Sequence, residues 1–145
     1  MASPSASALT AAPSSPAATA TAADIATAAA AVDGYTRLLV KGDWSAAYAL
    51  LAPASRDHYG SLANFTYERA AYFKSVAGRY TVKIPAPADV GSITDWLPDT
   101  YGTSVDLGHT VLVEVDYPAL AGNNAGYGLY LVAPGSGGLL IFDVR

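Results

Sequence analysis

Apolar residues recur at helical spacing through the first half of the chain. Over residues 24–41 they return every three or four positions, which predicts an amphipathic helix with Asp24 as its N-cap. Gly42 can end this helix in the left-handed conformation. Asp43 can then cap a second helix, predicted over residues 44–51, by accepting a hydrogen bond from a free backbone N–H. The pattern therefore predicts two helices joined by a tight turn.

A third helix is predicted further along the chain. Pro53 is expected to close the second helix, because proline removes a backbone donor and clashes with the preceding turn. Residues 55–61 are polar and predict a turn or a short helical loop. Asn64 is the expected N-cap of the third helix and Gly78 its end. One side of this helix carries Phe65, Arg69, Tyr72, Phe73 and Val76.

After Gly78 the period of the pattern changes from helical to two. Alternation predicts strands over residues 79–84, 109–117, 127–133 and 139–144, with the last two joined as a hairpin. The strand 109–117 is the clearest of them, because three valines share one of its faces (Val111, Val113 and Val115). Residues 85–108 are rich in Asp, Pro and Gly and are expected to be irregular, with a short strand or helical turn at 93–97.

The order of these elements, helices first and strands afterwards, indicates an α+β fold. We expect three N-terminal helices packed on one face of a curved antiparallel sheet. Residues 1–23 contain no charged side chain and almost no large apolar one, so burial there cannot offset the entropy of ordering. The expected organisation is a disordered Ala/Ser/Thr/Pro tether over 1–23, followed by a single domain over 24–145.

Three short motifs resemble the nuclear-transport-factor-2-like superfamily, the cystatin-like cone fold, in its bacterial extracytoplasmic members. Gly42-Asp43-Trp44 is similar to the family's junction between its first two helices. Residues 50–56 resemble a stretch of the bacterial members, and residues 138–144 partly match the family's C-terminal pattern. The resemblance implies a strongly curved sheet that encloses a pocket against the helices. Enzymes of this fold place carboxylates, tyrosines and sometimes a histidine in that pocket.

The last predicted strand departs from the family pattern. Leu139 stands where an aromatic residue is common, and Leu140 and Phe142 stand where polar residues are usual. This strand is therefore apolar on both faces, and a strand buried on both faces needs cover on both. The resemblance implies that a second copy supplies the cover, in a homodimer formed through the open sheet face. The alternative is that segment 85–108 of the same chain folds over that face.

Composition excludes several classes of chemistry. The absence of cysteine excludes disulfides, thiol catalysis and thiolate metal sites. The net charge is −4 and the eight basic residues are scattered, so no nucleic-acid partner is expected. No apolar run approaches the roughly 20 residues of a membrane-spanning helix. Two isolated histidines without clustered acids predict no metal site, and no cofactor is expected.

Two interpretations of the N-terminus compete. Met1 is followed at once by Ala-Ser-Pro-Ser, without the basic and apolar regions of a signal peptide. In one interpretation the chain is a complete cytoplasmic protein with an unusual tail. In the other, a signal or lipoprotein leader, with any lipid anchor, has been removed. A tether of this composition before a domain suits a secreted or surface-anchored bacterial protein, so we predict an extracellular or cell-envelope location.

Three residues are candidates for acid–base catalysis. His109 opens the clearest strand and shares a side with its valines, so it can line the rim of the pocket. Glu114 and Asp116 share the opposite face, at the spacing that lets two carboxylates meet over a substrate. The alternative for all three is a plain surface position. His58 lies between Asp57 and Tyr59, but neighbouring side chains do not face each other, so a polar turn explains that triplet more simply.

The aromatic residues predict a binding surface. Tyrosine combines apolar area with a hydroxyl group and suits an amphipathic pocket lining. The predicted ligand-binding residues are Tyr35, Tyr48, Tyr72, Trp96, His109 and Tyr127. The leading prediction is a non-enzymatic extracytoplasmic domain that binds a small molecule or a partner protein. The alternatives are a small isomerase, dehydratase or hydrolase that uses a carboxylate or histidine base, and an accessory domain of a larger cell-envelope protein.

Overall fold

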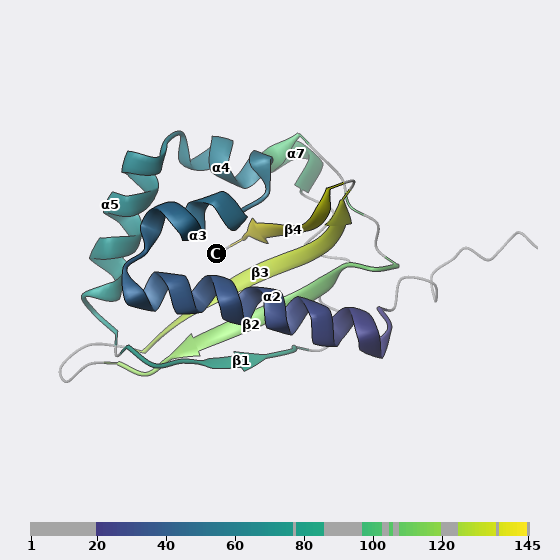
Figure 1. Ribbon diagram of the computed structural model, residues 1–145, viewed down its shortest axis with the longest axis horizontal. Coiled ribbons are helices and arrows are strands. Elements are labelled where there is room, and N and C mark those ends of the chain that lie inside the picture. The colour runs from purple at the N-terminus through teal and green to yellow at the C-terminus, as the bar shows by residue number, and fades with distance from the viewer. Residues whose placement is uncertain are drawn as a thin grey trace, which may run out of the picture.

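The computed structural model describes residues 20–76, 78–85, 97–102, 105, 108–119, 125–135 and 137–144 (Figure 1). Within them the chain forms five helices and one four-stranded antiparallel sheet, which confirms the α+β class. The strands lie side by side in chain order: β1 (Thr81–Lys83), β2 (Val111–Tyr117), β3 (Gly126–Gly135) and β4 (Gly138–Asp143). The sheet is neither closed nor strongly curled, so these strands do not show the strong curvature that we expected.

Helix α2 (Ala22–Lys41) is the longest element and lies across one face of the sheet (Figure 1). Its N-cap is Thr21, whose Oγ1 accepts a hydrogen bond from the backbone N–H of Asp24 while the Asp24 carboxylate accepts one from the N–H of Thr21. The prediction that Asp24 is the cap is therefore wrong, because Asp24 is the third residue of a Thr-x-x-Asp capping box. At the other end, Gly42 has a φ of 78° and Asp43 caps α3 (Trp44–Leu50), as predicted.

Two further helices, α4 (Pro53–Tyr59) and α5 (Leu62–Phe73), follow α3. Pro53 begins α4, since the first helical position needs no backbone donor, and α4 occupies most of the segment predicted as a turn or helical loop. Ser61 caps α5 by accepting a hydrogen bond from the N–H of Asn64. Asn64 is thus the recipient of the cap rather than its source, which corrects the prediction. The helix ends at Phe73 and not at Gly78.

The junction between α3 and α4 is fixed to the edge of the sheet. The backbone N–H of Ala52 donates to the carbonyl of Ile141 on β4 at 2.8 Å, and Leu51 forms a parallel bridge with the same residue. This contact places α4 beside the end of β4. Helix α7 (Leu97–Tyr101) contacts α4, where the rings of His58 and Tyr101 meet edge to face at 5.2 Å.

The two faces of the sheet carry separate hydrophobic clusters. The inner face, which carries Val113 and Val115, packs against α2. The outer face carries Leu112 and Phe142, and the cluster on it includes Leu97 together with Tyr101 and Val105. The last strand is therefore buried on both faces at Ile141 and Phe142, as predicted. Residues of segment 85–108 of the same chain, Leu97, Tyr101 and Val105, therefore lie in the cluster that covers Phe142. The homodimer stays a prediction.

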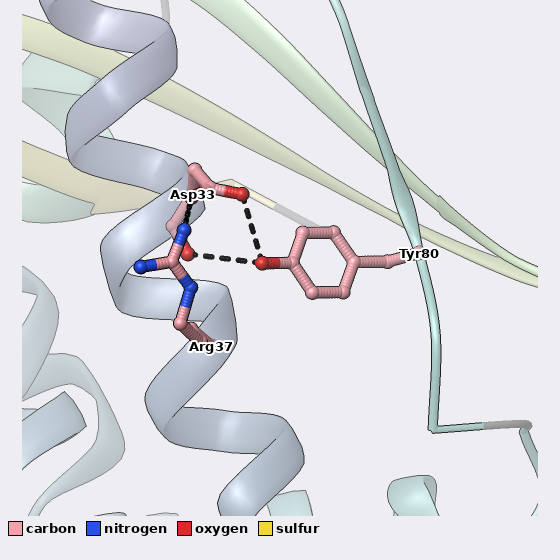
Figure 2. Close-up of polar contacts among 3 residues, drawn as sticks. All are labelled: Asp33, Arg37 and Tyr80. Carbon is pink, nitrogen blue, oxygen red and sulfur yellow. Dashed lines mark hydrogen bonds and ion pairs between the residues drawn. The ribbon is translucent and has the colours of Figure 1, made fainter.

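The edge strand β1 is attached to α2 through the residue before it. Tyr80 Oη donates to Asp33 Oδ1 at 2.8 Å, and Arg37, one turn further along α2, forms an ion pair with the same carboxylate (Figure 2). Tyr80 and Val82 both pack against the inner cluster. The strand itself is shorter than the predicted 79–84. In the part of the chain that the structure describes, no helix is both long and apolar enough to cross a membrane.

Candidate functional site

A group of polar side chains, five of them buried and three partly buried, lies where the helices meet the inner face of the sheet. They come from every layer: two from α2, one from α4, two from α5 and one each from β2, β3 and β4. Helical spacing turns Tyr35 and Arg69 inward, and strand alternation does the same for Tyr117 and Tyr130. We call this group the tyrosine–arginine cluster; its members are Tyr35, Thr36, Tyr59, Arg69, Tyr72, Tyr117, Tyr130 and Asp143.

Aromatic contacts fix the frame of the cluster. Tyr35 and Tyr130 meet edge to face with ring centroids 5.4 Å apart, and Tyr72 meets Tyr117 in the same way at 5.7 Å. The guanidinium carbon of Arg69 lies 5.4 Å from the centre of the Tyr72 ring, within the range of a cation–π contact. Such edge-to-face pairs add about 0.5–1.5 kcal/mol beyond the area they bury, so the rings hold their positions firmly.

Five polar atoms of the cluster are enclosed and have no hydrogen-bond partner among the described residues. They are the hydroxyl oxygens of Tyr35, Thr36, Tyr72 and Tyr117 and the Nε of Arg69. Tyr35 and Thr36 are 0% exposed and Tyr117 is 2% exposed. Each unpartnered buried group costs about 1–3 kcal/mol. Native proteins contain few such groups, and five of them in one cluster indicate that something other than these residues satisfies them.

Two glycines on β3 make room for the tyrosine hydroxyls. A Cβ atom on Gly126 would lie 2.0 Å from Tyr72 Oη, and one on Gly128 would lie 2.9 Å from Tyr130 Oη. Neither distance is compatible with a side chain at the glycine. The backbone of β3 therefore forms part of the wall around the hydroxyls, which is a common reason for glycine inside a strand.

The tyrosines of the cluster are neutral donors. Burial, reinforced by the charge of Asp143, raises the pKa of Tyr35 and of Tyr130 well above the ordinary value. Burial raises the pKa of Tyr117, and the charge of Tyr72 adds a smaller rise. The nearby hydroxyls of Tyr130 and Thr36 lower this pKa somewhat, although neither meets the geometry of a hydrogen bond with Tyr117 Oη. Each phenol keeps its proton at neutral pH. The hydroxyls therefore offer O–H groups toward any oxygen that enters the cluster.

The charges of the cluster are a carboxylate and a guanidinium. Asp143 is 8% exposed, and its carboxylate accepts a hydrogen bond from Tyr59 Oη. Its backbone is held as well: its N–H donates to Ser55 Oγ at 3.2 Å, and its carbonyl accepts from Tyr101 Oη at 2.6 Å. Burial lowers the pKa of the Arg69 guanidinium, but the nearby Tyr59 and Asp143 raise it by more, so the net shift is upward. Arg69 is therefore ionised at neutral pH.

Two of the predicted ligand-binding residues, Tyr35 and Tyr72, belong to the cluster. Tyr48 lies beside it, where its ring contacts Phe65 at 5.1 Å and its hydroxyl donates to the carbonyl of Arg56 at 3.0 Å. The hydroxyl of Tyr48 is thus used within the protein. Trp96 lies outside the described residues. The structure places the other two predicted residues, His109 and Tyr127, elsewhere.

His109 lies at a groove near the start of α2. Its Nδ1 is 3.1 Å from Asp24 Oδ2, and both side chains border an open groove of about 440 Å³ with Thr27, Val132 and Leu139. His109 thus borders this groove, and its role at the rim of a ligand pocket between the helices and the sheet stays a prediction. The side chain is exposed, however, and no member of the tyrosine–arginine cluster lines the groove.

Glu114, Asp116 and Tyr127 lie on the outer face. Asp116 forms an ion pair with Lys83, and a hydrogen bond that protonated Glu114 donates to Asp116, with a smaller effect of burial, raises the pKa of Glu114. Asp116 and Tyr127 are direct partners in the β2–β3 ladder and border a second open groove of about 500 Å³. The two carboxylates do meet, as their spacing predicted, but on the solvent side of the sheet. Tyr117 and Gly126 line this groove too, so it adjoins the cluster.

Sequence reasoning missed Tyr59, Arg69 and Asp143 as members of a site. Arg69 gave a signal, because it is a charged residue within the apolar side of α5. Asp143 appeared only as part of the C-terminal motif, and Tyr59 only in the polar triplet with His58. Their meeting depends on the junction of α3 and α4 docking on β4, a contact between residues 90 positions apart that no local pattern reveals.

The chain was compared with protein families, curated proteins and solved structures. No protein-family model, no curated protein and no solved structure matches this chain. Within the described residues, no three His, Cys, Asp or Glu side chains lie close enough together to hold a metal ion.

Proposed function

We propose that this chain is an extracytoplasmic binding domain of the nuclear-transport-factor-2-like type, and that its tyrosine–arginine cluster holds a small molecule. The observation that carries the proposal is the set of five enclosed polar atoms without partners. A bound molecule with oxygen atoms among these donors would remove the cost of leaving them unsatisfied. The expected N-terminal tether supports the extracytoplasmic part of the proposal.

The surroundings of these atoms also favour a small organic ligand. Five tyrosine rings belong to the cluster (Tyr35, Tyr59, Tyr72, Tyr117 and Tyr130), so the unpartnered polar atoms lie among largely apolar aromatic surface. Binding sites for small molecules have this composition. The open groove lined by Tyr117 and Gly126 adjoins the cluster, because Tyr117 is a member of it and a Cβ on Gly126 would meet Tyr72 Oη.

Binding is favoured over catalysis by the position of the predicted bases. His109, Glu114 and Asp116 all lie outside the cluster, at exposed grooves or on the outer face. One observation favours the enzymatic alternative: Asp143 is a buried carboxylate beside the Tyr59 hydroxyl and opposite Tyr130 in the β3–β4 ladder. A carboxylate base next to phenolic donors is an arrangement that can move a proton.

Native mass spectrometry of the protein purified from its own organism tests the proposal. We expect a mass higher than that of the chain by one small adduct, and we expect the adduct to be lost from the double variant Tyr35→Phe/Tyr72→Phe. The double variant Tyr48→Phe/Tyr127→Phe is the matched control, since it removes two hydroxyls outside the cluster. Recovery of the adduct in chemically changed form after incubation would support the enzymatic alternative. A bare chain, with ordered water on all five polar atoms in a crystal structure, would contradict both.

A further inference from the structure

We infer that the ligand of the tyrosine–arginine cluster carries one carboxylate group, and that this group binds to Arg69 and the unpartnered hydroxyls. The inference rests on the proposed function and adds the chemical class of the ligand. It follows from the charge of Arg69, from the kind of polar atoms that are left without partners, and from the position of Asp143.

Arg69 is a partly buried cation without a direct counter-charge. Its guanidinium forms no ion pair with any carboxylate among the described residues, and its Nε is enclosed and makes no hydrogen bond with them. Asp143 lies close enough to stabilise the positive charge, but its carboxylate is engaged by Tyr59 Oη. The enclosed Nε–H is therefore a donor without an acceptor, which costs about 1–3 kcal/mol, and an anionic group on a ligand would supply that acceptor.

The remaining unpartnered atoms point to the same chemistry. The guanidinium Nε can only donate a hydrogen bond, and the phenols of Tyr35, Tyr72 and Tyr117 keep their protons and can donate as well. A group that satisfies all of them must offer several acceptor positions close together. A carboxylate offers about four such positions on two oxygens, and its planar shape matches the guanidinium.

The charge balance favours a carboxylate over a group with two negative charges. Asp143 already offsets part of the positive charge of Arg69, so each negative charge on a ligand adds to an excess of negative charge, and a single carboxylate adds less of it than a group with two charges. Glu68 is the other nearby acid, and it acts on Tyr59 in the same sense as Asp143. A single carboxylate on an aromatic or aliphatic body therefore suits both the charges and the aromatic walls.

The test compares two probes of the same shape, benzoate and the neutral benzamide, added to the whole chain. Binding is followed by NMR chemical-shift titration. We expect benzoate to bind at least tenfold more tightly than benzamide, with the largest shifts at the backbone of residues in the cluster. In Arg69→Met this preference should disappear, and in Arg69→Lys part of it should return. Arg37→Met is the matched control, because it removes the same charge from an exposed position on α2.

The outcomes separate the ligand class from the proposed function. Equal binding of benzoate and benzamide at the cluster would overturn the carboxylate and leave a binding site for neutral molecules. Recovery of a neutral adduct from the native protein would do the same. Failure of both probes to shift any cluster residue would overturn the inference for small aryl acids, and the adduct measurement then decides the proposed function by itself. Should Arg69→Met fail to fold, Tyr35→Phe/Tyr72→Phe replaces it, and a retained benzoate preference there would contradict the inference.

Discussion

The polar groups on the two faces of the sheet differ in their exposure to solvent and in their hydrogen-bond partners. On the outer face, Lys83, Glu114 and Asp116 are accessible to solvent and interact with one another. On the inner face, the hydroxyls of Tyr35 and Tyr117 are enclosed and have no partner among the described residues. Charges at a solvated surface cost little and need no function to explain them. Enclosed donors without partners are costly, so the inner face is where function is to be sought.

The largest expected difference between the faces concerns two tyrosines of β3. Tyr130 is 1% exposed on the inner face, whereas Tyr127 is 48% exposed on the outer face. We expect Tyr130→Ala to lower the free energy of unfolding by about 3–5 kcal/mol, because it removes a fully packed ring and leaves a cavity. Tyr127→Ala should change the free energy by about 0.5 kcal/mol or less. Urea denaturation of both variants measures the difference.

A small effect of Tyr130→Ala would show that the inner face is loosely packed and would remove the rigid frame from the candidate site. If the alanine variant does not fold, the milder Tyr130→Leu provides the measurement, with a smaller loss in the same direction. Equal losses for Tyr127 and Tyr130 would contradict the distinction between the faces, because the two residues would then be buried alike.

A second comparison concerns two glycines, Gly126 beside the cluster and Gly34 in α2. A Cβ on Gly126 would meet Tyr72 Oη at 2.0 Å, so Gly126→Ala must displace the Tyr72 ring and should destabilise the protein by about 1–3 kcal/mol. A Cβ on Gly34 meets nothing within 4 Å. Gly34→Ala should therefore stabilise the protein by about 0.5–1 kcal/mol through its helix propensity. Thermal unfolding of both variants shows whether Gly126→Ala lowers the stability and Gly34→Ala raises it.

The position of Tyr72 decides how the Gly126 result is interpreted. Adding Tyr72→Phe to Gly126→Ala removes the oxygen atom that lies nearest to the new Cβ and should recover part of the lost stability. If Gly126→Ala is as harmless as Gly34→Ala, the Tyr72 hydroxyl does not lie against the strand, and its place among the unpartnered donors is wrong.

The helices and strands were predictable because local rules specify them. Gly42 and Asp43 provide a stop signal and a start signal in adjacent positions, and the alternation in β2 extends over seven residues. Caps were harder, since Thr21 and Ser61 lie three residues before the acid and the amide to which we assigned the role. In the capping box of Thr21 and Asp24 both side chains take part, and in both helices the side chain nearer the N-terminus is the cap.

The site was less predictable than the fold, because its members meet through contacts between distant parts of the chain. Tyr59 and Asp143 are separated by 84 positions, and only the docking of α4 beside β4 brings them together. Alternation correctly placed Glu114 and Asp116 opposite the valines, but it could not show that the interior contained unsatisfied donors. That property depends on the positions of individual hydroxyls, which sequence patterns do not report.

The smallest expected changes in stability distinguish a hydroxyl of the cluster that makes a hydrogen bond, on Tyr59, from one that has no partner among the described residues, on Tyr35. Tyr59 Oη donates to the carboxylate of Asp143, so Tyr59→Phe should lower the free energy of unfolding by about 1–3 kcal/mol by removing this donor to a buried carboxylate. Tyr35 Oη has no partner among the described residues, so Tyr35→Phe should leave the stability of the unliganded protein unchanged or raise it by up to about 1 kcal/mol. Chemical denaturation of ligand-free protein compares the two variants.

The sign for Tyr35 is the sharpest check on the proposed site, because both substitutions remove one oxygen atom and nothing else. A loss for Tyr35→Phe as large as that for Tyr59→Phe would mean that the Tyr35 hydroxyl is already satisfied within the unliganded protein, for instance by ordered water. The cost of unpartnered donors would then be absent, and with it the main reason to expect a ligand. A neutral or stabilising result, together with loss of the adduct in the same variant, would show that this hydroxyl is kept for binding at no benefit to the fold.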